Sequence, residues 1–159
     1  GHEGAAGGRA GAAAEDELSR DAIAAQVLDA NRRFYEALER LDMEAMEACW
    51  ATGDDVACLH PGGPWQRGWD EVREGWEAIM ANTGYIEFEI AGERASVVDP
   101  VAWVTCVERI TSVGQGGEHV TAEVAATNVF VLDGSGWHMV LHHASPVVRP
   151  APAEEGQSN

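Results

Sequence analysis

The sequence predicts an α+β fold in which three N-terminal helices pack on one face of a strongly bent, mostly antiparallel sheet. Two observations carry this prediction. Apolar residues recur at helical spacings as far as about residue 80, and from Tyr85 they alternate with a period of two. The alternating stretches are rich in Val, Ile, Thr and aromatic residues and are separated by turn sequences, so we expect five strand segments: 85–90, 94–98, 101–112, 119–132 and 137–145.

The first helix is expected to begin at Ser19, which can cap it, with Asp21 at the positive end of the helix dipole. An apolar stripe at spacings of three and four then marks its buried side: Ile23, Val27, Ala30, Phe34, Leu38 and Leu41. Asp42 is expected to cap a short second helix. The connection is so tight that the two helices should form a hairpin.

A short strand at 56–60 is expected to end at Pro61, which opens a run of two prolines and two glycines. A third helix should follow and end near residue 80. The later segments 101–112 and 119–132 exceed the usual strand length, which predicts a strongly bent sheet with a concave face lined by helices.

The chain has 159 residues and a mass of 17.0 kDa, the size of one domain. The segments 1–18 and 148–159 are Gly/Ala-rich or featureless, so we expect flexible tails on either side of a domain at 19–147. The three cysteines are far apart and form no CxxC pair, which favours reduced thiols. No secretion signal is visible, and the cytoplasm is the expected location.

The net charge of −17 excludes several classes of partner. So acidic a surface repels phosphate backbones and anionic lipids, and the chain carries no basic stripe that could override the repulsion. No apolar run approaches the roughly 20 residues that cross a bilayer. We therefore expect neither nucleic acid nor a membrane as partner.

Four groups of residues stand in a distinctive order along the chain. They are Phe34-Tyr35-Glu36-Ala37-Leu38 with Asp42 and Trp50; Leu59-His60-Pro61-Gly62; Gly68 with Trp76; and Asp133-Gly134-Ser135-Gly136-Trp137 leading to His142-His143-Ala144-Ser145-Pro146. This order, over about 21–147, resembles the nuclear transport factor 2-like superfamily and, within it, the SnoaL-like group. The resemblance implies a cone-shaped α+β barrel. In such a cone a curved sheet wraps around the first helix, a pocket opens between them, and dimers form through the convex sheet face.

Ketosteroid isomerase, a member of this superfamily, provides a residue-by-residue comparison. Its oxyanion-hole tyrosine falls at Phe34, its aspartate base at His60 and its protonated aspartic acid at Asn128. One donor is lost, the base becomes an imidazole and the acid becomes an amide. Steroid isomerisation by that mechanism is therefore not supported.

Two of these positions remain candidate catalytic residues. His60 is a candidate general base because imidazole titrates near neutral pH; the alternative is a loop histidine that hydrogen-bonds the turn backbone. Asn128 is in phase with Val124, Ala126 and Phe130. If that phase faces the pocket, its amide can stabilise an oxyanion; otherwise it is a satisfied polar spacer or an interface residue.

Three histidines near the C-terminus invite a metal hypothesis, which strand geometry disfavours. His138 and His142 share a face but lie ~13 Å apart in a regular strand, while His142 and His143 point to opposite faces. We therefore expect no metal site. His143 is in phase with Trp137 and Met139, so it is the histidine expected to face the pocket and a third catalytic candidate, with His142 facing outward or toward a partner chain.

Aromatic residues are numerous, and each offers a large apolar surface to a flat ligand. The candidate ligand-binding residues are Phe34, Tyr35, Trp65, Trp76 and Trp103. The alternative is that the aromatic side chains only fill the interior of the cone.

Three charged residues lie inside strand segments: Glu108, Arg109 and Glu123. We expect them to form cross-strand or intersubunit pairs and not to act in catalysis.

Two hypotheses for the function stay open. The first is a SnoaL-like protein that binds a small apolar molecule in the cone pocket, its enzymatic form being a cofactor-independent isomerase, cyclase or dehydratase acting on an apolar carbonyl compound. The second is a non-catalytic dimeric binding or assembly module on the same fold. No cofactor is expected in either, and a homodimer through the sheet face is expected in both.

Overall fold

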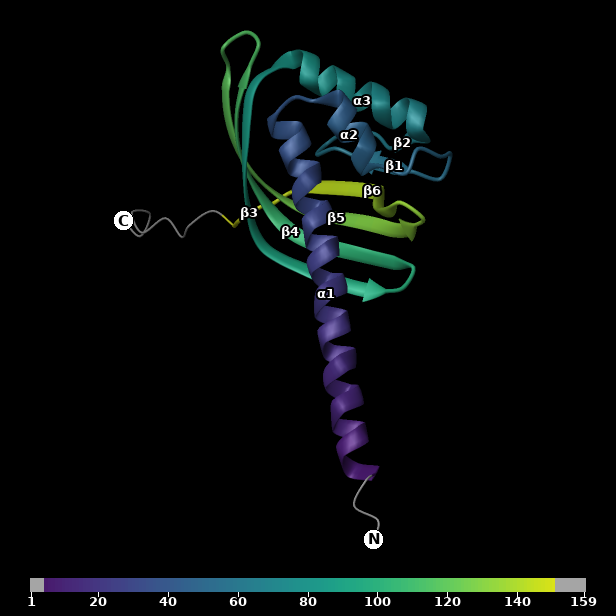
Figure 1. Ribbon diagram of the computed structural model, residues 1–159. Helices are drawn as coiled ribbons and strands as arrows, with labels where there is room; N and C mark the ends of the chain where they lie inside the picture. Colours follow the sequence, from purple (N-terminus) through teal and green to yellow (C-terminus); the bar gives the residue numbers. More distant parts are fainter. Residues whose placement is uncertain (1–4, 151–159) are drawn as a thin grey trace, which may run out of the picture.

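The computed structural model of the protein describes residues 5–150, and side chains from residue 10 onward. Within that range three helices pack against one six-stranded sheet, which confirms the predicted α+β class (Figure 1). The elements are α1 (Ala5–Glu39), α2 (Met43–Cys49), β1 (Ala57–Leu59), β2 (Gln66–Arg67), α3 (Trp69–Asn82), β3 (Thr83–Val98), β4 (Val101–Gly114), β5 (His119–Asp133) and β6 (Gly136–Pro146).

The sheet has the strand order β2-β1-β6-β5-β4-β3. Only β1 and β6 run parallel, and the other neighbours are antiparallel, as predicted. The long strands β3 to β5 bend strongly, and α1 crosses their concave side, while α2 and α3 lie near the β1–β2 edge (Figure 1). The sheet remains open, because its edge strands β2 and β3 do not pair with each other.

The first helix starts earlier than the sequence predicted. It begins at Ala5 and not at Ser19, because the alanine-rich sequence upstream has high helix propensity. Residues 10–22 are exposed, and packing against the body of the protein begins at Ile23 (Figure 1). The flexible segment expected at 1–18 is therefore helical where it is described, while 1–4 and 151–159 lie outside the described residues. The domain limits 19–147 stay a prediction.

The predicted helix hairpin is confirmed. The side chain of Asp42 accepts a hydrogen bond of 3.0 Å from the backbone nitrogen of Ala45 and caps α2. Leu41, just before it, has a φ of 51°, the left-handed conformation that reverses the chain after a helix. No helix among residues 5–150 is both long and apolar enough to cross a membrane.

The inner face of the sheet is built by strict alternation in β4 and β5. Every second residue is buried from Ala102 to Glu108 in β4 and from Val124 to Phe130 in β5. These side chains face α1 and form the core with the apolar stripe of that helix. Asn128 is buried on this inner face together with Val124, Ala126 and Phe130, so the condition set for its role in the pocket is met as far as its facing is concerned.

Alternation fails in β6 because the strand contains a bulge. Met139 pairs with Phe130, whereas Leu141 pairs with Val129, so Val140 is an extra residue without a partner in the ladder. Side chains beyond Val140 therefore face the side of the sheet opposite to the one that alternation predicts.

Candidate functional site

A cavity of about 160 Å³ lies between α1, α3 and the inner face of the sheet. Most of its wall is apolar and comes from α1, α3 and the first half of β3: Phe34, Leu38, Trp76, Ile79, Ile86 and Phe88. The titratable side chains in the wall are Tyr35, His60, Glu108 and His142. Pro61 is exposed and Ile86 half-buried, so the cavity opens between the loop after β1 and the start of β3.

Glu108 is the buried carboxyl group of this cavity. It faces inward from β4 between Cys106 and Ile110 and is only 4% exposed. Burial raises the pKa of Glu108 from 4.5 to about 7, opposed by a hydrogen bond of 2.6 Å that the Tyr35 hydroxyl donates to Oε2. The carboxyl group can therefore both take up and release a proton near neutral pH.

A buried amide holds the polar side chains of the site in place. Nδ2 of Asn128 donates to Oδ1 of Asn31 at 2.8 Å and to the hydroxyl of Tyr35 at 3.1 Å. Its Oδ1 lies 2.6 Å from Nδ1 of His142 and must accept, so His142 carries its proton on Nδ1. The hydrogen bonds thus run from His142 through Asn128 and Tyr35 to the carboxyl group of Glu108.

His142 is a neutral hydrogen-bond acceptor in this arrangement. Complete burial, helped by the neighbouring His60 and His143, lowers the pKa of His142 to about 3. Its free Nε2 lies 4.0 Å from Oε2 of Glu108, too far for a hydrogen bond, and an uncharged imidazole makes no ion pair. His142 and Glu108 therefore both line the cavity without a hydrogen bond between them.

His60 lies where the cavity opens, half-buried beside the exposed Pro61. Its ring meets Trp76 edge-on at 4.7 Å, and Nε2 lies 3.5 Å from Sγ of Cys58. Burial lowers the pKa of His60, against a hydrogen bond with Gln66 that raises it, so the imidazole is neutral at pH 7.

The model of the SnoaL-like domain family matches residues 27–149, which include the whole cavity wall. The chain belongs to this family. A solved structure from Streptomyces avermitilis, named as a candidate dehydratase of the NTF2-like family, is 40% identical; it covers 81% of this chain and 99% of its own, with a TM-score of 0.77. A candidate calcium/calmodulin-dependent protein kinase type II association domain from Thiobacillus denitrificans is 30% identical, with coverages of 75% and 93% and a TM-score of 0.66.

The F-box protein SKIP8 of Arabidopsis thaliana is 28% identical over 119 residues, 75% of this chain. The matched region spans about half of that relative, 48% of its length.

Three of the five predicted ligand-binding residues line the cavity of this SnoaL-like domain: Phe34, Tyr35 and Trp76. The other two lie elsewhere. Trp103 is half-buried in the phase of β4 opposite to the inner face, and Trp65 contacts His143 edge-on at 5.3 Å, outside the cavity wall. The prediction that Trp65 and Trp103 line the pocket is therefore wrong. The sequence shows that these side chains are large and aromatic, but it does not show which side of the sheet they face.

The predicted orientation of two histidines is also wrong. His142 is buried in the cavity wall, whereas His143 is half-buried on the opposite face. The physical reason is the bulge at Val140, which shifts the phase by one residue. His143 is thus not placed for catalysis in the cavity.

Asn128 faces inward, but its geometry does not suit an oxyanion donor. Both hydrogens of the amide are already donated, to Asn31 and Tyr35, and the residue does not line the cavity. Asn128 is therefore a positioning residue, which fixes Tyr35 and His142.

Glu108 was missed as a site residue because it was expected to form a cross-strand or intersubunit pair. That expectation holds for its neighbour Arg109, which pairs with Glu89 across strands at 3.0 Å, and Glu123 pairs with Arg149. The sequence pattern that could have identified Glu108 is its position on the strand. It lies on the same face of β4 as Val104, where the other inward side chains are apolar.

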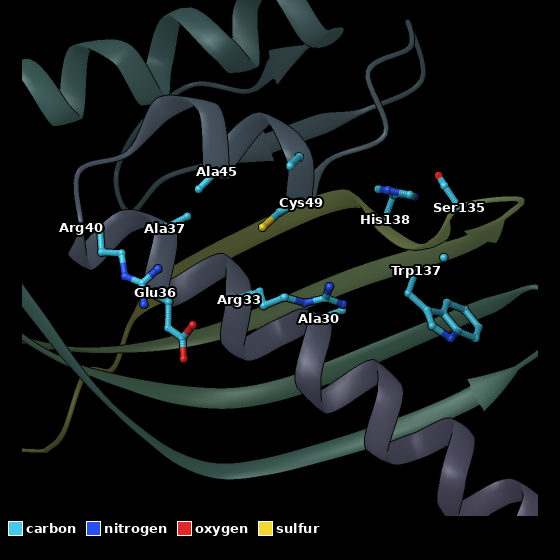
Figure 2. Close-up of a pocket in the computed structure, with 12 residues that line it drawn as sticks. Ala30, Arg33, Glu36, Ala37, Arg40, Ala45, Cys49, Ser135, Trp137 and His138 are labelled. Carbon is cyan, nitrogen blue, oxygen red and sulfur yellow. The ribbon is translucent and has the colours of Figure 1, made fainter.

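A larger hollow of about 370 Å³ lies on another face of α1, against α2 and the β5–β6 turn (Figure 2). Figure 2 shows Arg33, Glu36 and Arg40 along α1, with Cys49 across from them. Arg33 is mostly exposed, and burial raises the pKa of the Cys49 thiol to about 11. The carboxyl group that lines this hollow, that of Glu36, is only half-buried, whereas Glu108 is buried in the wall of the smaller cavity, which is the candidate site.

Among residues 10–150, no cluster of three or more His, Cys, Asp or Glu side chains is arranged to hold a metal ion.

Proposed function

We propose that this SnoaL-like domain binds a small carbonyl compound in its cavity and catalyses a cofactor-independent proton transfer, as an isomerase or dehydratase. One observation carries the proposal. Glu108 is a carboxyl group buried in an apolar cavity, and its pKa of about 7 lets it act as a base and then as an acid in one reaction cycle.

In the proposed reaction Glu108 removes a proton from the carbon next to the carbonyl group, and the electron pair of that C–H bond moves toward the carbonyl oxygen. The protonated carboxyl group then returns the proton. Return to another carbon of the same molecule gives an isomer; delivery to a departing hydroxyl group gives an alkene and water. Tyr35 stabilises the ionised form of Glu108 by donating to Oε2.

The neighbouring side chains supply the other interactions that such a reaction needs. We assign to His60 the donation of a ring N–H to the carbonyl oxygen, which an uncharged imidazole can do without giving up its proton. His142 is an acceptor for a hydroxyl group of the substrate. Phe34 and Trp76 hold its apolar body.

The name of the Streptomyces avermitilis relative supports this choice of reaction. It is a candidate dehydratase that is 40% identical and aligned over 81% of this chain. Dehydration next to a carbonyl group begins with the same proton removal as isomerisation, so both outcomes depend on a base such as Glu108.

The test is the exchange of the α-protons of cyclohexanone in D₂O, followed by proton NMR with and without the protein. We expect catalysed exchange by the wild type, and loss of that catalysis in E108Q, which keeps the shape of the side chain but cannot take up a proton. The control E89Q removes an exposed carboxylate of β3, whose side chain is 72% exposed, and should retain full exchange. Equal exchange in wild type and E108Q would contradict the proposal.

A dimeric assembly module is the second candidate function. It is favoured by the 30% identical candidate association domain, and by half-buried apolar side chains on the convex face of the sheet: Trp103, Val107, Val129 and Leu141. We propose a homodimer through this face. Sedimentation velocity over a range of concentrations should show a dimer that W103R weakens, and a strict monomer at high concentration would contradict it. The cytoplasmic location stays a prediction.

A further inference from the structure

We infer that the ligand of the cavity is an uncharged compound with a single ring and one carbonyl oxygen, and neither an organic acid, an organic cation nor a polycyclic compound. The inference rests on the proposed function in one respect only, the carbonyl group. The limits on size and charge follow from the cavity itself.

The size limit follows from the volume of about 160 Å³. A buried apolar cavity of roughly 150 Å³ accommodates one benzene molecule. The wall offers little room for expansion, because Phe34 and Trp76 are fully buried and meet edge-on at 5.4 Å. A second fused ring would have to displace side chains at the opening, where Ile79 and Ile86 are only half-buried.

Anions are excluded by the charge of the wall. Among the described residues, no arginine lines the cavity, and the chain contains no lysine. The two histidines of the wall, His60 and His142, are uncharged near neutral pH. A carboxylate or phosphate would thus enter without a counter-charge and would lie near Glu108.

An organic cation suits the cavity better than an anion does, because aromatic rings and a carboxylate can together bind an ammonium group. The burial of Glu108 disfavours organic cations. The carboxyl group lies in a largely apolar wall, and burial opposes the negative charge on it that would have to balance the cation.

The distribution of polar groups sets the orientation of the ligand. Glu108 and His142 come from β4 and β6 on the sheet side, and His60 lies at the opening. The walls from α1, α3 and β3 are apolar apart from Tyr35. A ring therefore packs against Phe34 and Trp76 while its carbonyl end meets the polar groups.

The experiment compares four probes by saturation-transfer NMR titration at neutral pH. Acetophenone fits the inferred class; benzoate has the same shape with a negative charge, benzylammonium carries a positive charge, and 2-acetylnaphthalene adds a ring. We expect acetophenone to bind at least about tenfold more tightly than each of the others. Equal or tighter binding of benzoate, benzylammonium or the naphthyl ketone would overturn the corresponding limit.

A variant at the opening tests the size limit without altering the polar groups. I86A should admit 2-acetylnaphthalene and raise its affinity about tenfold, whereas V120A, at an exposed site of β5, should not change the order of the four probes. Unchanged exclusion of the naphthyl ketone by I86A would contradict the assigned opening.

The two proposals fail in different ways. If acetophenone binds selectively but E108Q does not reduce α-proton exchange, the ligand class stands and the proposed reaction falls. If E108Q abolishes exchange while benzoate binds as well as acetophenone, the reaction stands and the ligand class falls.

Discussion

Replacing Glu108 by glutamine should stabilise the protein increasingly as the pH rises. The folded-state pKa of about 7 lies above the ordinary value of 4.5, so the unfolded chain gives up this proton at lower pH than the folded protein. The contribution of Glu108 to stability is therefore fully present below pH 4.5 and is lost as the pH rises through 7. Glutamine has no proton to lose and should escape this loss.

The magnitude follows from the two pKa values. Between pH 5 and pH 8 the linkage relation gives a loss of about 2.5 kcal/mol for the wild type relative to E108Q. For a chain of this length each kcal/mol moves the melting temperature by roughly 2–4 °C, so the advantage of E108Q should grow by about 5–10 °C. Near pH 5 the protonated carboxyl group and the amide have similar shape and charge, and both can accept from Tyr35.

The assay is urea unfolding of both proteins at pH 5 and pH 8, followed by tryptophan fluorescence, because the difference between the two proteins cancels the titration of all other groups that act independently. E89Q is the control for the loss of one carboxylate from the surface, and its difference from the wild type should stay small. A constant difference between wild type and E108Q at the two pH values would refute the reasoning, since it would mean that Glu108 ionises in the folded protein as readily as in the unfolded chain.

Three further variants test the surrounding network. Y35F removes the donor to Glu108, so the pKa of Glu108 should rise further and the pH midpoint of cyclohexanone exchange should move upward; an unchanged midpoint would contradict the role of this hydrogen bond. N128A leaves polar groups of Asn31, Tyr35 and His142 without a partner and should lower the free energy of unfolding by about 2–4 kcal/mol in urea, whereas a loss below 1 kcal/mol would mean that water replaces the amide. Burial lowers the pKa of His142 to about 3 from 6.5, so stability is lost as the pH falls below 6.5, by about 3 kcal/mol at pH 4. H142Q should show a smaller acid loss in the same assay, and an equal loss would place the titration elsewhere.

The fold was predictable because its determinants are local. Helical spacing, the Asp42 cap and the change of period near Tyr85 identify the three helices, most of the strands and the α+β class. The segments expected at 85–90 and 94–98 form one continuous strand, β3, and the two-residue strand β2 was not predicted. The start of α1 at Ala5 was missed because Ser19 offers a good cap, yet the helix continues upstream of Ser19 through a segment in which alanines outnumber glycines.

The site was only partly predictable, because it depends on which side of the sheet a residue faces. Phase correctly grouped Asn128 with Val124, Ala126 and Phe130, since β5 alternates regularly there, but it did not say which side of the sheet this group faces. The same reasoning assigned His142 and His143 to the wrong faces of the sheet, because the bulge at Val140 is apparent only when β6 pairs with β5. The role of Glu108 depends on burial by α1 and on the Tyr35 hydroxyl, both remote in sequence.

The most direct test of the central role of Glu108 is a carboxyl titration by carbon-13 NMR, with the δ-carbons of the glutamates labelled. The signal of Glu108 is the one that disappears in E108Q. We expect it to titrate with a midpoint near pH 7, shifted upward in Y35F. A midpoint near 4.5, as in an exposed side chain, would show that the cavity holds an ionised carboxylate at neutral pH and would contradict the proposed acid–base role.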